Sequence, residues 1–348
     1  MCENIDVLED YIEERWSGVL DELLIDHTKH HRKLSHHSSY NIVWATDSYA
    51  ALGEDYASDR PILKHLITGK NGYVIQPRAS KNRDEQLRRT KDKAEVFTPS
   101  WVCNAQNNLI DNAWFGIGHE NQFNTENPDH TWTTHHSPIQ FPAGRTWQDY
   151  VLAQRLELTC GEAPYLCSRY DTVSGREIPV SERIGLLDRK LRIVGENADT
   201  PDEWLVEAFN ALHSTYGFEW QGDNLLLARE AVLYTFKEHY EEKFRQELDE
   251  KTLENAAYII SWNLWQMDGI KCVVPDSCAS INRNQQLSLF GDDKPKECPA
   301  CQKGTNTGHT GIRCEVVEWR AVTMKEPHRT GSKRNTYIYP NLKSAIKE

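Results

Sequence analysis

The chain has 348 residues and a formal net charge of −12 at pH 7. That length suits one main domain with appendages, or two domains. Hydrophobic residues make up 39% of the chain and charged residues 26%, which is enough apolar material for a core and excludes a largely disordered protein. The acidic charge argues mildly against a dedicated nucleic-acid binder, although a local basic groove or a basic partner subunit could still hold DNA.

No run of about 18 apolar residues occurs, so the sequence predicts no membrane span. The N-terminal residues Met1-Cys2-Glu3-Asn4-Ile5-Asp6 are acidic and lack the apolar core of a signal peptide. The nine cysteines then fit a reducing cytosol, where thiols stay free or bind metal. We therefore expect a cytoplasmic protein.

The first 90 residues begin with a predicted helix over 1–26, in which apolar residues recur at helical spacing. A basic stretch over 78–93 follows later and carries Arg78, Lys81 and Arg89 among its cations. It could form a strip for DNA phosphates or simply a solvated helix face. We expect residues 1–90 to be an N-terminal region with a role in DNA contact.

The next segments alternate between helical and strand-like patterns. Thr98-Pro99 precedes a helix-like run from Asn104 to Asp111, and Pro is favoured where a helix starts. A strand-like run then ends at the turn Thr159-Cys160-Gly161-Glu162, where Gly161 would let the backbone approach a ligand closely. The second of these segments predicts the first strand and the ligand-binding turn of an α/β sheet.

Two acids follow at positions that suit a nucleotide site. Asp188 lies in the apolar segment 184–194, 27 residues after Gly161, where an acid after a second strand would hold ribose hydroxyls. The alternative is an acid that caps an amphipathic helix. Farther on, Asp223 and Asn224 sit in a Gly-containing turn and could hydrogen-bond an adenine amino group, or could simply lead into the next helix.

An amide stands beside tryptophan in the strand-like segment 259–269. Asn263 could accept a hydrogen bond from an exocyclic amine while Trp265 stacks on a flipped base. The alternative is a Trp-rich core segment.

Taken in order, these segments resemble the adenine-N6 DNA methyltransferases of restriction-modification systems, and more narrowly the family usually described as restriction endonuclease subunit M. The resemblance covers about residues 40–275. It implies an S-adenosylmethionine-dependent modification subunit that methylates adenine N6 in double-stranded DNA and works with a restriction or specificity subunit. Its fold would be a Rossmann-like, doubly wound α/β methyltransferase sheet over residues 91–275.

The resemblance also implies roles for individual residues. The predicted cofactor-binding residues are Phe97, Thr98, Pro99, Thr159, Cys160, Gly161, Glu162, Asp188, Asp223 and Asn224. Within this set the Thr-Pro segment would contact the methionine part of the cofactor, the glycine loop and the ribose acid would follow, and the Gly-Asp element would meet the adenine.

The sequence departs from the family pattern at the catalytic tetrapeptide Asn-Pro-Pro-Tyr, which is absent. Ser261-Trp262-Asn263-Leu264-Trp265 stands in its expected place, so Asn263 and Trp265 are the predicted catalytic residues. The glycine loop has also lost its second glycine. These departures support an alternative hypothesis, in which a catalytically degenerate methyltransferase-like protein serves as a recognition or scaffold subunit of a defence complex.

The C-terminal part carries two further patterns. Cys298, Cys301, His309 and Cys314 form Cys-x2-Cys-x7-His-x4-Cys, a ligand set that suits tetrahedral zinc, with Cys272 and Cys278 as alternative ligands. The peptide Gln286–Phe290 resembles the short motif with which bacterial proteins dock the replication sliding clamp. We expect a linker over 276–297 and a zinc-binding tail over 298–348.

Overall fold

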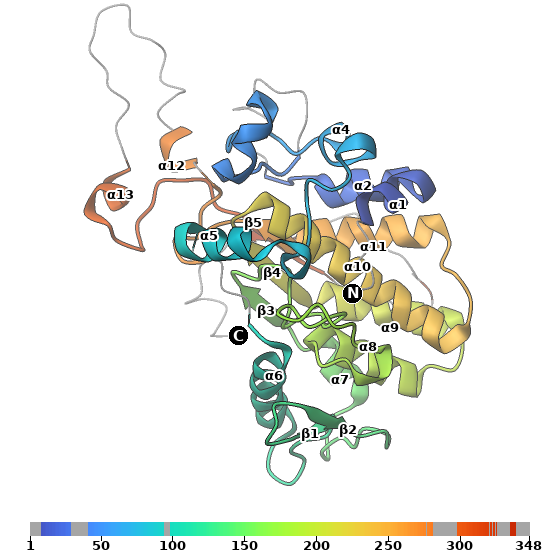
Figure 1. The fold of residues 1–348 in the computed structure, drawn as a ribbon. Coiled ribbons are helices and arrows are strands. Elements are labelled where there is room, and N and C mark those ends of the chain that lie inside the picture. Colours follow the sequence, from blue (N-terminus) through green and yellow to red (C-terminus); the bar gives the residue numbers. More distant parts are fainter. Residues whose placement is uncertain are drawn as a thin grey trace, which may run out of the picture.

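The computed structural model describes residues 8–28, 41–93, 98–275, 277–280, 298–319, 321, 323, 325 and 335–338. Its fold is mixed α/β, with long helices packed around small sheets (Figure 1). Two predicted features lie outside the described residues, namely Phe97 of the cofactor segment and the clamp-like peptide Gln286–Phe290.

A three-stranded parallel sheet with the order β3-β4-β5 packs against the helical body. Its strands are β3 (Arg155–Leu158), β4 (Thr215–Glu219) and β5 (Leu264–Gln266). Because the strands are parallel, their carboxyl ends meet at one edge of the sheet. The predicted α/β class is thus confirmed, but the described strands make a smaller sheet than the doubly wound one expected.

The helical body is built around the longest helix, α10 (Gly222–Phe244), which crosses the middle of the molecule (Figure 1). Three helices pack around it: α8 (Leu186–Asn197), α9 (Pro201–His213) and α11 (Glu250–Asn263). Thr200 and Glu203 form a capping box at the start of α9. The Asp249 side chain caps α11 by accepting from the Thr252 N–H, so both helix starts satisfy backbone donors that the helix itself leaves open.

The N-terminal region packs against this body. It begins with α1 (Leu8–Arg15) and α2 (Ser17–Leu24), and α2 lies against α11. The apolar residues that predict one helix over 1–26 therefore belong to two short helices that meet at Trp16. Within the described residues 41–93, five short helices follow, and these are η1 (Asp47–Leu52), η2 (Glu54–Tyr56), α4 (Lys64–Ile67), η3 (Gly69–Asn71) and η4 (Arg78–Ser80). The longer helix α5 (Arg83–Lys93) ends this region.

A smaller unit lies at the other side of the sheet, below β3 in Figure 1. Its elements are α6 (Ser100–Phe115), the hairpin β1 (Asn124–Glu126) and β2 (Trp132–Thr134), and α7 (Trp147–Leu152). The predicted helix from Asn104 to Asp111 falls within α6. The remaining elements are η5 (Val180–Glu182), α12 (Ser277–Ser280), α13 (Pro299–Lys303), β6 (Glu315–Glu318) and β7 (Asn335–Ile338).

The two faces of the central sheet are covered by different parts of the chain. Leu264 belongs to the main core with the helices, whereas Phe218 and Trp265 belong to a second apolar cluster. Cys314 and Val317 of the C-terminal part complete that second cluster. Since side chains alternate along a strand, one face of the sheet packs on the helices and the other on the tail.

The predicted strand over 184–194 is helical in the structure, whereas the strand-like segment 259–269 is helical up to Asn263 and forms β5 from Leu264 to Gln266. The segment 184–194 falls mainly in α8, and residues 259–263 are the last turns of α11. In both segments the apolar residues that suggested strands are buried by helical packing, and Leu187, Leu191 and Val194 share one face of α8 at helical spacing. No helix among the described residues is long and apolar enough to cross a membrane.

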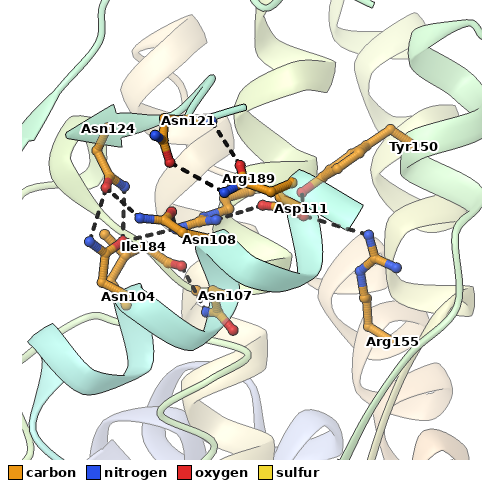
Figure 2. Close-up of polar contacts among 12 residues, drawn as sticks. Asn104, Asn107, Asn108, Asp111, Asn121, Asn124, Tyr150, Arg155, Ile184 and Arg189 are labelled. Atoms are coloured by element: carbon orange, nitrogen blue, oxygen red, sulfur yellow. Dashed lines mark hydrogen bonds and ion pairs between the residues drawn. The ribbon is translucent and has the colours of Figure 1, made fainter. Parts of the chain in front are cut away.

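A buried polar network joins α6 to α8 (Figure 2). Arg189 of α8 donates to the Asp111 carboxylate at 2.5 Å and to the side-chain oxygens of Asn104 and Asn108 at 2.9 and 2.8 Å. Asn124 of β1 exchanges hydrogen bonds with Asn104. One cation thus satisfies most of the polar face that α6 buries, and it fixes the helix that starts at the Thr98-Pro99 segment.

Substitution of Arg189 by Met should lower the free energy of unfolding by about 3–5 kcal/mol, because it removes the cation that pairs with the buried Asp111 carboxylate and donates to two buried amide oxygens. Urea unfolding followed by circular dichroism measures this change. Lys251→Met is the control, since Lys251 and Glu254 form an exposed pair worth at most about 1 kcal/mol. Equal losses in the two variants would show that the buried network does not hold α6.

Candidate functional site

The ends of all three parallel strands meet at the carboxyl edge of the sheet. The Cys160 N–H donates to the Phe218 carbonyl, and the Met267 N–H donates to the Glu219 carbonyl, both at 2.8 Å. A Cβ added to Gly269 would lie 3.2 Å from Cγ2 of Thr159, so the loop after β5 touches the loop after β3. Ligands of open α/β sheets bind at this kind of edge.

The glycine loop follows β3, as the sequence predicts. The backbone takes positive φ at Thr159 (54°), Gly161 (55°) and Ala163 (61°), so the chain makes tight left-handed turns there. A Cβ added to Gly161 would meet nothing within 4 Å, which means that open space borders this residue. A ligand can therefore approach the Gly161 backbone without a side chain in the way.

Glu219 ends β4 directly beside this loop. Its carboxylate accepts from the Gly161 N–H at 2.8 Å and from the Gln221 N–H at 3.0 Å. Burial raises the pKa of Glu219 to about 7. In dinucleotide-binding folds an acid at the end of the strand next to the glycine loop holds the ribose, and Glu219 occupies that position here.

Sequence reasoning missed Glu219 because it placed the second strand too early. The signal was present as the run Tyr216-Gly217-Phe218 ending in an acid, but Glu219 lies 58 residues after Gly161, much farther than the spacing of about 20 that such motifs usually show. Helices α8 and α9 fill the additional chain.

Asp188, the predicted ribose acid, does not end a strand. It lies in the first turn of α8, almost fully buried, where it accepts from the Ser168 N–H at 2.8 Å and contacts the His239 ring nitrogen at 3.0 Å. The prediction of a second strand ending in Asp188 is wrong, and the alternative of an acid within an amphipathic helix describes the residue. Its contacts tie α8 to α10.

Asp223 and Asn224 lie in the first turn of α10, and both are buried. Asp223 pairs with Arg89 of α5 at 2.6 Å and accepts from the Tyr49 hydroxyl at 2.8 Å. Burial would raise the pKa of Asp223, but the nearby cations Arg89 and Lys81 lower it below its usual value. These contacts bring α5 over the carboxyl edge, where Figure 1 draws it beside β4 and β5.

The basic stretch 78–93 is therefore partly turned inward. Arg89 bonds to Asp223, and the Lys81 ammonium, also buried, donates to the Gln76 carbonyl. Arg78 donates its backbone N–H to Glu162 of the glycine loop at 2.7 Å. The charged groups of Arg89 and Lys81 are thus bound to the protein itself, which weakens the prediction of a strip for DNA phosphates.

The remaining predicted cofactor residues lie near the glycine loop. The Thr98 carbonyl accepts from the Thr172 hydroxyl at 2.9 Å, and Pro99 immediately precedes α6. Cys160 is buried against Gly217 of β4, and Glu162 accepts from Arg78 and Tyr170. Their contacts hold the loop in shape, so that of the predicted set Thr159 and Gly161 are the residues left at its surface.

Asn263 and Trp265 are structural in this fold. The Asn263 amide donates to the carbonyls of Leu212 and Thr215 at 2.8 and 3.0 Å, and its oxygen accepts from the Trp319 indole at 2.7 Å. Trp265 is 2% exposed and packs in the second apolar cluster. The alternative of a Trp-rich core segment is the one that fits, and neither side chain faces the glycine loop edge.

A second candidate site lies in the C-terminal part. Cys278, Cys298, Cys301 and His309 bring their ligand atoms within 4.8 Å of one another and could hold a metal ion. The predicted ligand Cys314 is not in this group, because it is fully buried in the second apolar cluster. Cys278 from the predicted linker takes its place.

Comparisons of the chain with family models, curated proteins and solved structures found no significant match. The geometry of its own residues therefore carries the functional argument.

We predict that Asn263→Ala lowers the melting temperature clearly, since it removes a donor from two buried carbonyls and the acceptor of the Trp319 indole N–H, each loss worth about 1–3 kcal/mol. Differential scanning calorimetry measures this effect. Asn197→Ala is the control, because the Asn197 amide donates only to the carbonyl one turn earlier in its own helix. A melting temperature unchanged by Asn263→Ala would contradict the structural role and restore Asn263 as a catalytic candidate.

Proposed function

We propose that this chain is a methyltransferase-like subunit of a DNA-modification system and that it binds S-adenosylmethionine at the carboxyl edge of β3-β4-β5. One observation carries the proposal. The glycine loop at Gly161 and the acid Glu219 stand side by side at the ends of neighbouring parallel strands, which is the arrangement that recognises a nucleoside.

Each part of the cofactor has a corresponding group at this edge. The Glu219 carboxylate would accept from the two ribose hydroxyls, exchanging its bond to the Gly161 N–H for bonds to the ligand. The open space at Gly161 would admit the sugar, and the Thr98-Pro99 segment would lie toward the methionine part, as the resemblance implies. The ligand exchanges existing hydrogen bonds rather than adding new ones, so we expect moderate affinity.

The described residues support a recognition role better than catalysis by Asn263. Methyl transfer to an adenine amine needs an amide and a backbone carbonyl that orient the nitrogen. Asn263 uses its amide to join α9, β4 and the tail instead. We therefore propose a subunit that binds the cofactor and acts with a restriction or specificity partner on double-stranded DNA, rather than an isolated enzyme built on Asn263 and Trp265.

We propose zinc as the ion of the Cys/His cluster. In a tetrahedral zinc site, thiolate sulfur and imidazole nitrogen lie about 3.6 Å apart. The distances from Nδ1 of His309 to the sulfurs of Cys278, Cys298 and Cys301 are 3.8, 3.7 and 3.3 Å. The other ring nitrogen, Nε2, lies 2.8 Å from the Thr305 carbonyl, which leaves Nδ1 for the metal.

Cofactor affinity should rise with pH around neutrality. The pKa of Glu219 is about 7, so the carboxylate that accepts from the ribose hydroxyls is mostly protonated at pH 6 and mostly ionised at pH 8. We expect the dissociation constant to fall about tenfold over that range, in proportion to the ionised fraction. Titration calorimetry with S-adenosylhomocysteine measures it. Glu219→Gln should bind weakly at both pH values, whereas Glu207→Gln on α9 should keep the wild-type profile.

The whole proposal is tested by measuring cofactor binding and methyl transfer separately. Purified protein is titrated with S-adenosylmethionine and is then incubated with it and unmethylated bacterial DNA, which is digested and searched for methylated nucleosides by mass spectrometry. Binding without N6-methyladenine supports the recognition subunit. If the protein binds S-adenosylmethionine and also produces N6-methyladenine, the proposed recognition role is wrong and the protein is an enzyme with another catalytic group. If it does not bind S-adenosylmethionine, the proposed nucleoside site is wrong.

A further inference from the structure

The tail forms one layer of the central sheet. Val317 of β6 packs against Phe218 and Trp265 on the sheet face opposite α10, and its carbonyl accepts from the Tyr216 hydroxyl at 3.1 Å. Trp319 follows it, stacks on the His213 ring with centroids 4.6 Å apart, and donates to Asn263. The short strand β6 thus covers part of the sheet face that carries Phe218 and Trp265.

This strand begins only a few residues after the Cys/His cluster. His309 is followed by Gly311, at which an added Cβ would lie 2.6 Å from the Ser277 hydroxyl oxygen and 2.8 Å from the Cys278 sulfur. The Ile312 N–H donates to that hydroxyl at 2.9 Å, and the Ile312 carbonyl accepts from the Val274 N–H at 2.8 Å. The chain therefore passes through a close-packed junction at the cluster just before it reaches the sheet.

We propose that a zinc ion held by Cys278, Cys298, Cys301 and His309 is a clamp that fixes β6 on the sheet face that carries Phe218 and Trp265. The inference rests on zinc as the ion at this cluster and is independent of the cofactor site. It assigns the metal a structural role in the body of the protein, beyond the folding of a separate tail.

The ligand spacing supports a clamp. Cys278 lies before the 19-residue segment 279–297 and the other three ligands lie after it, so one ion closes that loop. A bond that closes a loop removes chain entropy that contacts within the tail would otherwise have to offset.

The apolar core around α13 is too small to hold this part of the tail in place without a metal ion. Within α13 the single buried residue is Ala300, and Cys301 is exposed. Small units with so little apolar burial depend on a structural metal for folding. The metal therefore fixes Gly311 and Ile312 against α12, and these residues in turn set the position of β6.

The clamp is tested by combining metal analysis with hydrogen exchange on the full-length protein. Wild type should hold one zinc per chain by mass spectrometry. Cys301→Ser, which changes an exposed ligand, should lose the zinc and speed amide exchange in residues 315–318 at least about tenfold, without a change in α10. Lys303→Ser, at a neighbouring exposed position of the same helix, should keep both the zinc and the slow exchange.

Two further variants distinguish the ligand set that contains Cys278 from the sequence-predicted set that contains Cys314. Cys278→Ser should lose the zinc and Cys314→Ser should keep it, and the reverse result would overturn the tetrad. Protein without bound metal would overturn both the zinc site and the clamp while leaving cofactor binding to be measured independently. Zinc that can be removed with no change in exchange of residues 315–318 would keep the site but overturn the clamp.

Discussion

One buried cation, Arg229 in the middle of α10, joins the parts of this molecule that the chain keeps far apart. Its guanidinium donates to the carbonyls of Leu23 and Ile25 at the end of α2, and to those of Ser261 and Leu264 where α11 passes into β5. The last carbonyls of a helix have no partner within it, and burying them without a donor is costly. Burial lowers the pKa of Arg229 to about 10, so it stays charged at neutral pH.

The position of the candidate site follows from this junction. With β5 fixed, Gln266 at its end exchanges hydrogen bonds with the backbone of Val43, at 2.8 and 2.7 Å. That contact holds the N-terminal region over the carboxyl edge, where the Arg89 side chain pairs with Asp223 and the Arg78 backbone N–H donates to Glu162. The region predicted as a separate DNA-contacting segment is therefore part of the wall around the glycine loop.

Sequence patterns predicted the elements whose signal is local. A strand before the turn at Gly161, the helix after Pro99 and three of the four residues of the Cys/His cluster depend on short-range spacing and on glycine or cysteine chemistry, and the structure has all of them. Glu219 was missed, and Cys278 was named only as an alternative ligand, because their partners are distant in the chain. Glu219 becomes visible only when β4 pairs with β3, and Cys278 only when the chain returns after residue 297.

The same distinction between local and long-range contacts explains why Asn263 and Asp188 were predicted as site residues. A polar side chain within an apolar run is a candidate for chemistry as long as its neighbours in space are unknown. Once α9 and the tail are in place, the Asn263 amide has partners on both sides, and Asp188 has Ser168 and His239. Buried polar groups must be satisfied, and in a helical body this need accounts for most of them before function does.

The net charge and the placement of the cations bear on how the proposed subunit would bind DNA. The net charge is −12, and two cations of the basic stretch, Lys81 and Arg89, are buried in contacts with Gln76 and Asp223. They neutralise groups of the protein itself and contribute little to an outward field, whereas DNA binding depends on cations that displace counterions from phosphates. A subunit of this composition would contact DNA through a basic partner more readily than through its own surface. Electrostatics and the structural role of Asn263 therefore both support the proposal of a recognition role within a complex.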